Sequence, residues 1–327
     1  MPFSNFRTPR TKRLFITYLK DWIFVILMTA IFFGLDKLPP FRRLFSLQDK
    51  TIMYPYAQHE HVPVWLLLIL CFIVPLLTIS AYSLAVRKSV RDFHNGILGL
   101  CLGLSMTIMM TDIVKITVGR PRPDMLDRCQ PAAGSVDPPL GLSNYTICTT
   151  DLNSYLMKDA FKSFPSGHSS FSFAGLGYLS LYLAGKMHLF DKLGHTYKGF
   201  IFAGPWIGAL LVAISRTVDY RHHWQDVTVG AILGTGLAIF AYRQYYPPLW
   251  SDASDEPFAP RVGLDFAPTS GRDYPHTERY ADVDSSQNNL LATDLDDRYH
   301  LSSGSSGSGG GPQVDRRIDI SKGPNLV

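Results

Sequence analysis

The sequence is short of charge for its length. Charged residues make up 18% of its 327 residues, below the roughly 25% of an average soluble protein. The apolar residues are bunched into runs, which argues against two soluble domains despite a length that allows them. No small-residue cleavage site follows the first apolar run, so a cleaved signal peptide is not expected.

Cysteine is scarce as well. The four cysteines, Cys71, Cys101, Cys129 and Cys148, do not have the spacing of a zinc framework. Because of this spacing, we expect no structural metal. No internal repeat is evident.

Long apolar runs are what the sequence has instead. A bilayer core requires roughly 17–25 mostly apolar residues per helix, and six runs approach this length. They are Tyr18–Leu35, Val62–Ala85, Phe93–Val114, Ser169–Lys186, Gly199–Ile214 and Val227–Tyr246. Buried helices of a soluble protein are the alternative. The sequence favours an all-α, polytopic membrane protein with six transmembrane helices in a bundle.

Three parts are predicted along the chain. Residues 1–17 form a basic cytoplasmic arm, residues 18–250 the transmembrane domain, and residues 251–327 a cytoplasmic tail. The tail contains the linker-like stretch LSSGSSGSGGGP and no long hydrophobic periodicity, so it is expected to be disordered. It is also the candidate for recruiting protein partners. Nothing points to a nucleic acid.

The predicted orientation places both termini in the cytoplasm. The first twenty residues carry Arg7, Arg10, Lys12, Arg13 and Lys20 without an acidic residue, which favours the cytoplasmic side. Asn144 begins an Asn-Tyr-Thr sequon, which is glycosylated only in a lumenal or external loop. Cys129 and Cys148 share that loop, where an oxidising compartment would let them pair.

Three polar islands stand at the ends of predicted spans. They are Lys115 to Arg122-Pro123, Pro165 to His168, and Ser215-Arg216 to His222 and Asp226. The six-span topology places all three on the side away from the cytoplasm. We expect them to meet in space if the helices form a bundle.

The first two islands and Arg216 have the chemistry of a phosphate site. Arginine binds phosphate with two parallel hydrogen bonds, and Lys115 adds a point charge beside Arg122 and Arg216. The Ser166-Gly167 turn precedes a helix, so its backbone N–H groups can face an anion. Positioning and charge stabilisation dominate phosphoryl transfer, and this set needs no metal.

The third island supplies a candidate nucleophile. His222 and Asp226 are four residues apart, so on a helix they would face the same way. The carboxylate would then accept one ring N–H and leave the other nitrogen free to attack phosphorus. His223 has Val227 at the same spacing. The hypothesis makes His222 the nucleophile, Asp226 its orienting partner and His168 the general acid.

These motifs resemble the three signatures of the type 2 phosphatidic acid phosphatase superfamily. The sequence has them as Lys115 to Arg122-Pro123, Pro165–His168, and Ser215-Arg216 to His222 and Asp226. The resemblance implies six helices, dephosphorylation without magnesium, and a site facing away from the cytoplasm. It also implies the roles of Lys115, Arg122, Ser166, Gly167 and Arg216 in phosphate binding. The host membrane would be vacuolar, endoplasmic reticulum or Golgi, or plasma membrane.

Within that superfamily the sequence looks most like the fungal diacylglycerol pyrophosphate phosphatases. That branch implies diacylglycerol pyrophosphate, phosphatidate and lysophosphatidate as membrane substrates. A phosphatase for sphingoid or polyprenyl phosphates stays open, as does a lipid-phosphate transferase resembling inositol phosphorylceramide synthase. A catalytically inactive scaffold is disfavoured because every motif residue is present. For a diphosphate, an extra cation would come from Arg120, Arg128 or Arg221.

Overall fold

The computed structural model of the protein describes residues 9–261. Most of the predicted cytoplasmic tail lies outside the described residues. In the described part the chain is helical, and extended segments pair only as two isolated bridges, Phe45 with Ser143 and Pro131 with Cys148. This confirms the predicted all-α class.

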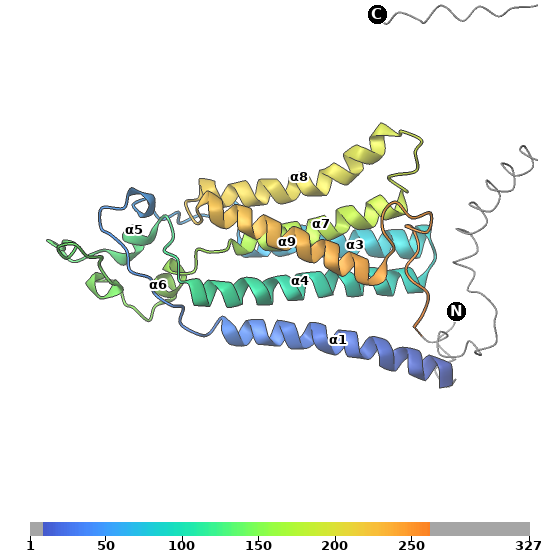
Figure 1. Ribbon diagram of the computed structural model, residues 1–327, viewed down its shortest axis with the longest axis horizontal. Helices are drawn as coiled ribbons and strands as arrows, with labels where there is room; N and C mark the ends of the chain where they lie inside the picture. Colours follow the sequence, from blue (N-terminus) through green and yellow to red (C-terminus); the bar gives the residue numbers. More distant parts are fainter. Residues whose placement is uncertain (1–8, 262–327) are drawn as a thin grey trace, which may run out of the picture. The chain divides into compact units, whose positions relative to one another are not determined.

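Six long helical stretches lie side by side, and consecutive ones run in opposite directions (Figure 1). The second stretch is segmented into α-helical and π-helical parts. The stretches are α1 (Pro9–Leu35); α2 (Val64–Leu68), η3 (Ile69–Ile73), α3 (Val74–Ala81) and η4 (Tyr82–Val86); α4 (Val90–Val118); α7 (Gly167–Lys186); α8 (Thr196–Val218); and α9 (Trp224–Tyr245). Helix α1 begins at Pro9, inside the predicted N-terminal arm.

Five of the six stretches are long and apolar enough to cross a membrane, so the protein is an integral membrane protein. The helix that falls short is α7, which contains the predicted span Ser169–Lys186. It packs against α4, α8, α9 and the segmented second stretch, and most of its residues are buried. A helix enclosed by others can carry serine and glycine, because its surroundings are protein instead of lipid.

The outer helices present apolar side chains outward. On α1, Phe24 is 61% exposed and Ile26 is 65% exposed. Leu211 on α8 is exposed in the same way. Continuous apolar surface of this kind would be unfavourable in water and suits the acyl chains of a bilayer.

Capping residues define where the central helices begin and end. The Ser89 side chain accepts a hydrogen bond from the Asp92 N–H at the start of α4, and Ser166 does the same for Ser169 at the start of α7. Helix α4 ends at Gly119, whose φ of 60° is left-handed. This conformation suits glycine, and a Cβ there would also lie 1.9 Å from the Phe41 carbonyl oxygen.

Residues 36–63 and 119–166 pack together beyond the end of α4, and we call them the cap (Figure 1). The cap contains η2 (Lys50–Ile52), α5 (Met125–Cys129), η5 (Tyr145–Ile147) and α6 (Tyr155–Ala160). Its small core consists of Phe45, Ile52, Met125, Cys129, Met157, Ala160 and Phe161. A disulfide joins Cys129 to Cys148, which confirms the pairing that the shared loop indicated.

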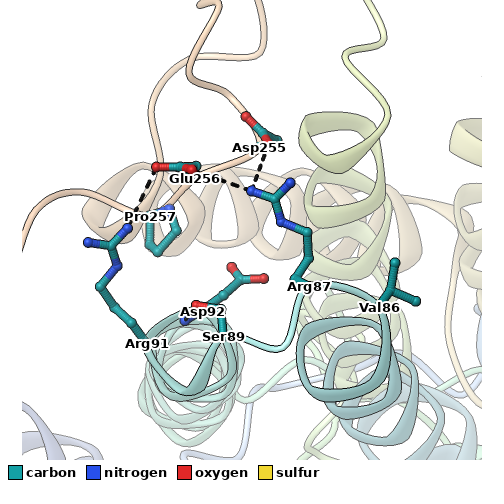
Figure 2. A pocket seen from close by; sticks show the side chains of 8 residues that line it. All are labelled: Val86, Arg87, Ser89, Arg91, Asp92, Asp255, Glu256 and Pro257. Carbon is teal, nitrogen blue, oxygen red and sulfur yellow. Dashed lines mark hydrogen bonds and ion pairs between the residues drawn. The ribbon is translucent and has the colours of Figure 1, made fainter.

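The opposite end of the bundle, where α4 begins and α9 ends, is called the tail end. Residues 251–261 differ from the predicted disordered tail, because they pack against this end. Arg87 pairs with Asp255 at 2.8 Å, and Glu256 lies 3.5 Å from Arg87 and 3.7 Å from Arg91. Figure 2 shows these contacts around a cavity of about 280 Å³.

Candidate active site

The cap end of the bundle brings together four helix ends: the ends of α4 and α8 and the starts of α7 and α9. Backbone and hydroxyl hydrogen bonds join α4, α7 and α9 there. The Ser166 N–H donates to the Asp226 carbonyl oxygen at 2.9 Å, and the Ser169 hydroxyl donates to the Val227 carbonyl oxygen at 2.7 Å. Thr111 on α4 and Ser170 on α7 share a hydrogen bond of 2.8 Å. The three polar islands therefore meet, as the sequence predicted.

Lys115 and Gly167 face each other across the start of α7. Lys115 stands in the last turn of α4. A Cβ built on Gly167 would lie 3.0 Å from the Lys115 ammonium nitrogen. Glycine thus lets the ammonium approach the first N–H groups of α7, and this is the arrangement expected of an anion site.

Arg122 reaches this region because the chain turns back after Gly119. Its guanidinium donates to both the carbonyl oxygen and the Oδ1 atom of Asp159, at 2.8 and 2.7 Å. Its Nη1 atom donates to the Arg221 carbonyl oxygen at 2.8 Å and lies 3.3 Å from the Nε2 atom of His222. Arg122 is therefore fixed beside the candidate nucleophile.

The local geometry predicted for His222 is wrong. Helix α9 begins at Trp224, so His222 precedes the helix and does not stack one turn below Asp226. The Nδ1 atom of His222 lies 4.0 Å from the Asp226 carboxylate but 2.6 Å from the Ser163 carbonyl oxygen. His223 instead caps α9: its backbone N–H and its Nδ1 atom contact Asp226 Oδ2 at 3.0 and 3.2 Å.

This geometry still leaves His222 with the better-placed nitrogen. A carbonyl oxygen can only accept, so Ser163 holds the proton on Nδ1 of His222. The Nε2 lone pair then faces Arg122 at 3.3 Å. Asp226 acts on His222 indirectly. Its carboxylate accepts the Ser163 hydroxyl at 2.6 Å and thereby fixes the segment that orients His222.

Burial and neighbouring charges favour a neutral His222. Burial lowers the pKa of His222 well below its ordinary value, and the positive charges of Arg122 and Lys115 lower it further. Burial alone would raise the pKa of Asp159, but Arg122 and Arg128 hold that pKa well below its ordinary value. The site thus combines a neutral imidazole with a charged carboxylate.

His168 and Arg216 complete the predicted set. The Nε2 atom of His168, at the start of α7, lies 3.0 Å from the Val62 carbonyl oxygen. Arg216 is 1% exposed at the end of α8. Its guanidinium donates to Glu60 Oε2 at 2.7 Å and to Asp219 Oδ2 at 2.8 Å.

Sequence reasoning missed several polar residues that hold this set in place. Asp159 and Glu60 lie in the cap, where no periodic pattern or motif marks them. Ser163 acts through its backbone carbonyl, which any residue type could supply. Arg120, which the sequence offered only as an extra cation for a diphosphate, pairs with Asp226 at 2.7 Å.

Asn144 lies on the exposed surface of the cap, at the start of η5. Its side chain accepts a hydrogen bond from the Thr146 N–H at 2.8 Å. Among residues 9–261 no group of three His, Cys, Asp or Glu side chains is arranged to hold a metal ion.

A family model described as the PAP2 superfamily matches residues 96–250. The chain is also 40% identical over 232 residues to "Lipid phosphate phosphatase 2" of Arabidopsis thaliana, covering 71% of this chain and 78% of that protein. The chain belongs to the PAP2 superfamily. A second relative within it, "Diacylglycerol pyrophosphate phosphatase 1" of Saccharomyces cerevisiae, is 40% identical over 234 residues, covering 71% of this chain and 80% of that protein.

No solved structure matches the chain. Membership of the PAP2 superfamily, together with phosphatases among the relatives, makes the protein a phosphatase. The family match begins at residue 96, so it includes α7, α8, α9 and most of α4. It thus contains the three polar islands, whereas the loop that carries Glu60 lies before it.

Proposed function

We propose that the protein removes phosphate from diacylglycerol pyrophosphate, phosphatidate and lysophosphatidate without a metal ion. The observation that carries this is the Nε2 atom of His222, which faces Arg122 in a buried, cation-lined site at the end of a membrane bundle. The names of the plant and yeast relatives support a lipid phosphate or diphosphate as substrate. Helices in lipid would bring such a substrate to the site along the bilayer.

The proposed reaction has two steps. The Nε2 lone pair of His222 attacks the terminal phosphorus, and the bond from phosphorus to the leaving oxygen breaks. His168 gives its proton to that oxygen, while Lys115, Arg122 and Arg216 stabilise the charge on the phosphoryl oxygens. Water then attacks the phosphohistidine and passes a proton to His168; the phosphorus–nitrogen bond breaks, and phosphate leaves as neutral His222 is restored.

A detergent-purified protein tests both substrate and mechanism. Phosphate release from diacylglycerol pyrophosphate and phosphatidate is measured with EDTA present, for wild type, His222→Ala and His223→Ala. We expect release to survive EDTA, to fall by at least about a thousandfold with His222→Ala, and to fall far less with His223→Ala. Equal losses for the two variants would contradict the assignment of His222.

If the wild type released no phosphate, the proposed hydrolysis would be wrong. Ceramide would then be added as an alcohol acceptor, and a phosphorylated ceramide product would show a transferase instead. Phosphate release from sphingoid and polyprenyl phosphates would be measured in the same preparation.

The proposed orientation places the cap in a lumenal or external compartment and both termini in the cytoplasm. The disulfide within the cap and the exposed sequon at Asn144 support this side. The host membrane is proposed to be vacuolar, endoplasmic reticulum or Golgi, or plasma membrane. A shift in electrophoretic mobility that glycosidase removes, and that Asn144→Gln abolishes, would confirm the side. A cap that an impermeant reagent reaches only from the cytoplasmic side would contradict it.

A further inference from the structure

The three arginines that the sequence offered as an extra cation, Arg120, Arg128 and Arg221, have no part in the proposed reaction. Arg120 pairs with the buried Asp226, and Arg128 pairs with Asp124 at 2.8 Å. If either arginine turned towards a ligand, it would leave a buried carboxylate without its partner, which is costly. These two arginines therefore belong to the fold.

Arg221 is held differently. Its Nη2 atom lies 3.1 Å from the Oε1 atom of Glu60, a cap residue whose side chain is 26% exposed. The other carboxylate oxygen of Glu60 lies 2.7 Å from Arg216 Nη1. One partly exposed carboxylate thus bridges two guanidiniums, and one of these, Arg216, is already a proposed phosphate ligand.

A carboxylate in this position marks an anion subsite. Carboxylate and phosphate oxygens accept the same forked hydrogen bonds from guanidinium groups. An arriving phosphate oxygen can therefore take the place of each Glu60 oxygen without moving either arginine. Because Glu60 is partly exposed, its displaced carboxylate can be solvated by water.

The segment that carries Glu60, residues 54–63, remains attached to the site by other contacts. Arg221 lies over the Tyr56 ring at 4.4 Å and donates to the Ala57 carbonyl oxygen at 3.0 Å. Val62 contacts His168, as described above, and the His61 N–H donates to Asp219 at 3.1 Å. Rotation of the Glu60 side chain alone would open the subsite, while the segment stays in place.

We propose that Arg221 forms a second phosphate subsite beside Arg216, occupied by the Glu60 carboxylate in the free protein and by the non-reacting phosphate of a lipid diphosphate in the complex, with Arg216 shared between this phosphate and the reacting one. This rests on the proposed lipid phosphatase function and specifies its preference between monophosphates and diphosphates. A monophosphate in front of His222 leaves Glu60 on Arg221. A diphosphate carries further negative charge and gains Arg221 in exchange for Glu60.

Inorganic pyrophosphate and orthophosphate serve as probes, because both are free of lipid. Their affinities for the detergent-purified protein are measured by titration calorimetry, and as inhibition constants for phosphate release. The variants are Glu60→Gln, Arg221→Gln and the matched control Glu256→Gln. Glu256 likewise lies near two arginines, Arg87 and Arg91, but at the tail end (Figure 2).

We expect Arg221→Gln to weaken pyrophosphate binding by about tenfold and orthophosphate binding by at most about threefold. Glu60→Gln is expected to strengthen pyrophosphate binding by about tenfold, because the competing charge is removed. The control should leave both affinities at wild-type values. A Glu60→Gln variant that binds pyrophosphate more weakly, or an Arg221→Gln variant that weakens both anions equally, would overturn the subsite.

The two proposals can fail separately. If pyrophosphate selectivity follows Arg221 and Glu60 but no lipid is hydrolysed, the subsite stands and the proposed function falls. If both lipids are hydrolysed but the variants treat the two anions alike, the function stands and the subsite falls. Thermal unfolding of each variant checks that a lost affinity does not come from a lost fold.

Discussion

The two ends of the bundle each bury an ionic cluster, and the clusters differ in how their charges are enclosed. At the tail end, Asp92 is 2% exposed and accepts Lys186 at 2.6 Å, Tyr246 at 2.8 Å and Tyr182 at 2.9 Å. At the cap end, Arg216 pairs with the buried Asp219 and shares with Arg221 the carboxylate of Glu60, which is partly exposed and lies in a loop.

The difference separates a structural cluster from a binding cluster. A carboxylate that receives three buried donors has little capacity left for a ligand, so it fixes the packing of α4, α7 and α9. Guanidiniums that share a partly exposed carboxylate can exchange that partner for another anion. Under the proposed subsite, similar residue types therefore serve stability at one end of the bundle and recognition at the other.

The largest effect is expected from breaking the buried cluster around Asp92 at the tail end. Asp92→Ala should destabilise the fold by about 3–5 kcal/mol, because the buried Lys186 ammonium loses its charge partner. Unfolding would be followed with a thiol-reactive dye, since Cys71 is buried inside the bundle. The double variant Asp92→Ala, Lys186→Met should recover part of the loss; a single variant as stable as wild type would contradict this account.

A smaller effect is expected at Asp159, which holds Arg122 at the cap end. Asp159→Asn should raise KM for phosphatidate by about tenfold, because Arg122 loses its charged partner and its fixed orientation. The unfolding temperature should change less than with Asp92→Ala. Steady-state kinetics in mixed micelles measure the effect, and an unchanged KM would show that Arg122 is oriented without Asp159.

Activity and stability should also depend on pH through His222 at the cap end. The folded-state pKa of His222 is held well below 6.5 by burial, Arg122 and Lys115, so the ring is neutral in the folded protein at pH 6.5. Activity should therefore not be lost through protonation of His222 as pH falls to 6.5. The unfolded chain binds the proton more readily, so the contribution of His222 to stability decreases as pH falls below the unfolded pKa.

A pH profile of kcat/KM for phosphatidate, paired with unfolding temperatures at each pH, measures both consequences. An acid limb of activity centred above pH 6.5 that shifts to still higher pH in Lys115→Met, where the cation that lowers the His222 pKa is gone, would contradict a neutral His222.

The smallest effect is expected from Glu256→Gln. Glu256 is 59% exposed where it pairs with Arg87 and Arg91, and exposed ion pairs contribute at most about 1 kcal/mol. Unfolding temperature and phosphate release should both stay near wild-type values. A loss of activity would mean that the tail end is coupled to the site, and the contrast between the two ends would no longer hold.

The sequence predicted the bundle and the meeting of its polar islands because both depend on strong local patterns. Long apolar runs indicate spans, and Lys115, Arg122, His168 and Arg216 stand in motifs at their ends. The predicted span Ser169–Lys186 matches α7 closely in its bounds, but α7 is less apolar than the other spans. Its serines and glycines are accommodated because other helices enclose it, and the sequence did not show that enclosure.

The contacts of His222 could not be predicted from the sequence. Four-residue spacing to Asp226 predicted a shared helical face, but His223 and Asp226 together form the cap that starts α9. Histidine is not among the usual N-cap residues, so the boundary was not evident from sequence. The contacts of Glu60 and Asp159 come from loops distant in the chain, and no local pattern encodes them.

The alternating direction of the helices also gives the site its pattern of charge. Each helix carries a partial negative charge at its C-terminal end and a partial positive charge at its N-terminal end. Lys115 and Arg216 lie in the last turns of α4 and α8, whereas Asp226 lies in the first turn of α9 and α7 begins at Gly167. The backbone dipoles thus favour cations on two helix ends and anions on the other two, before any substrate arrives.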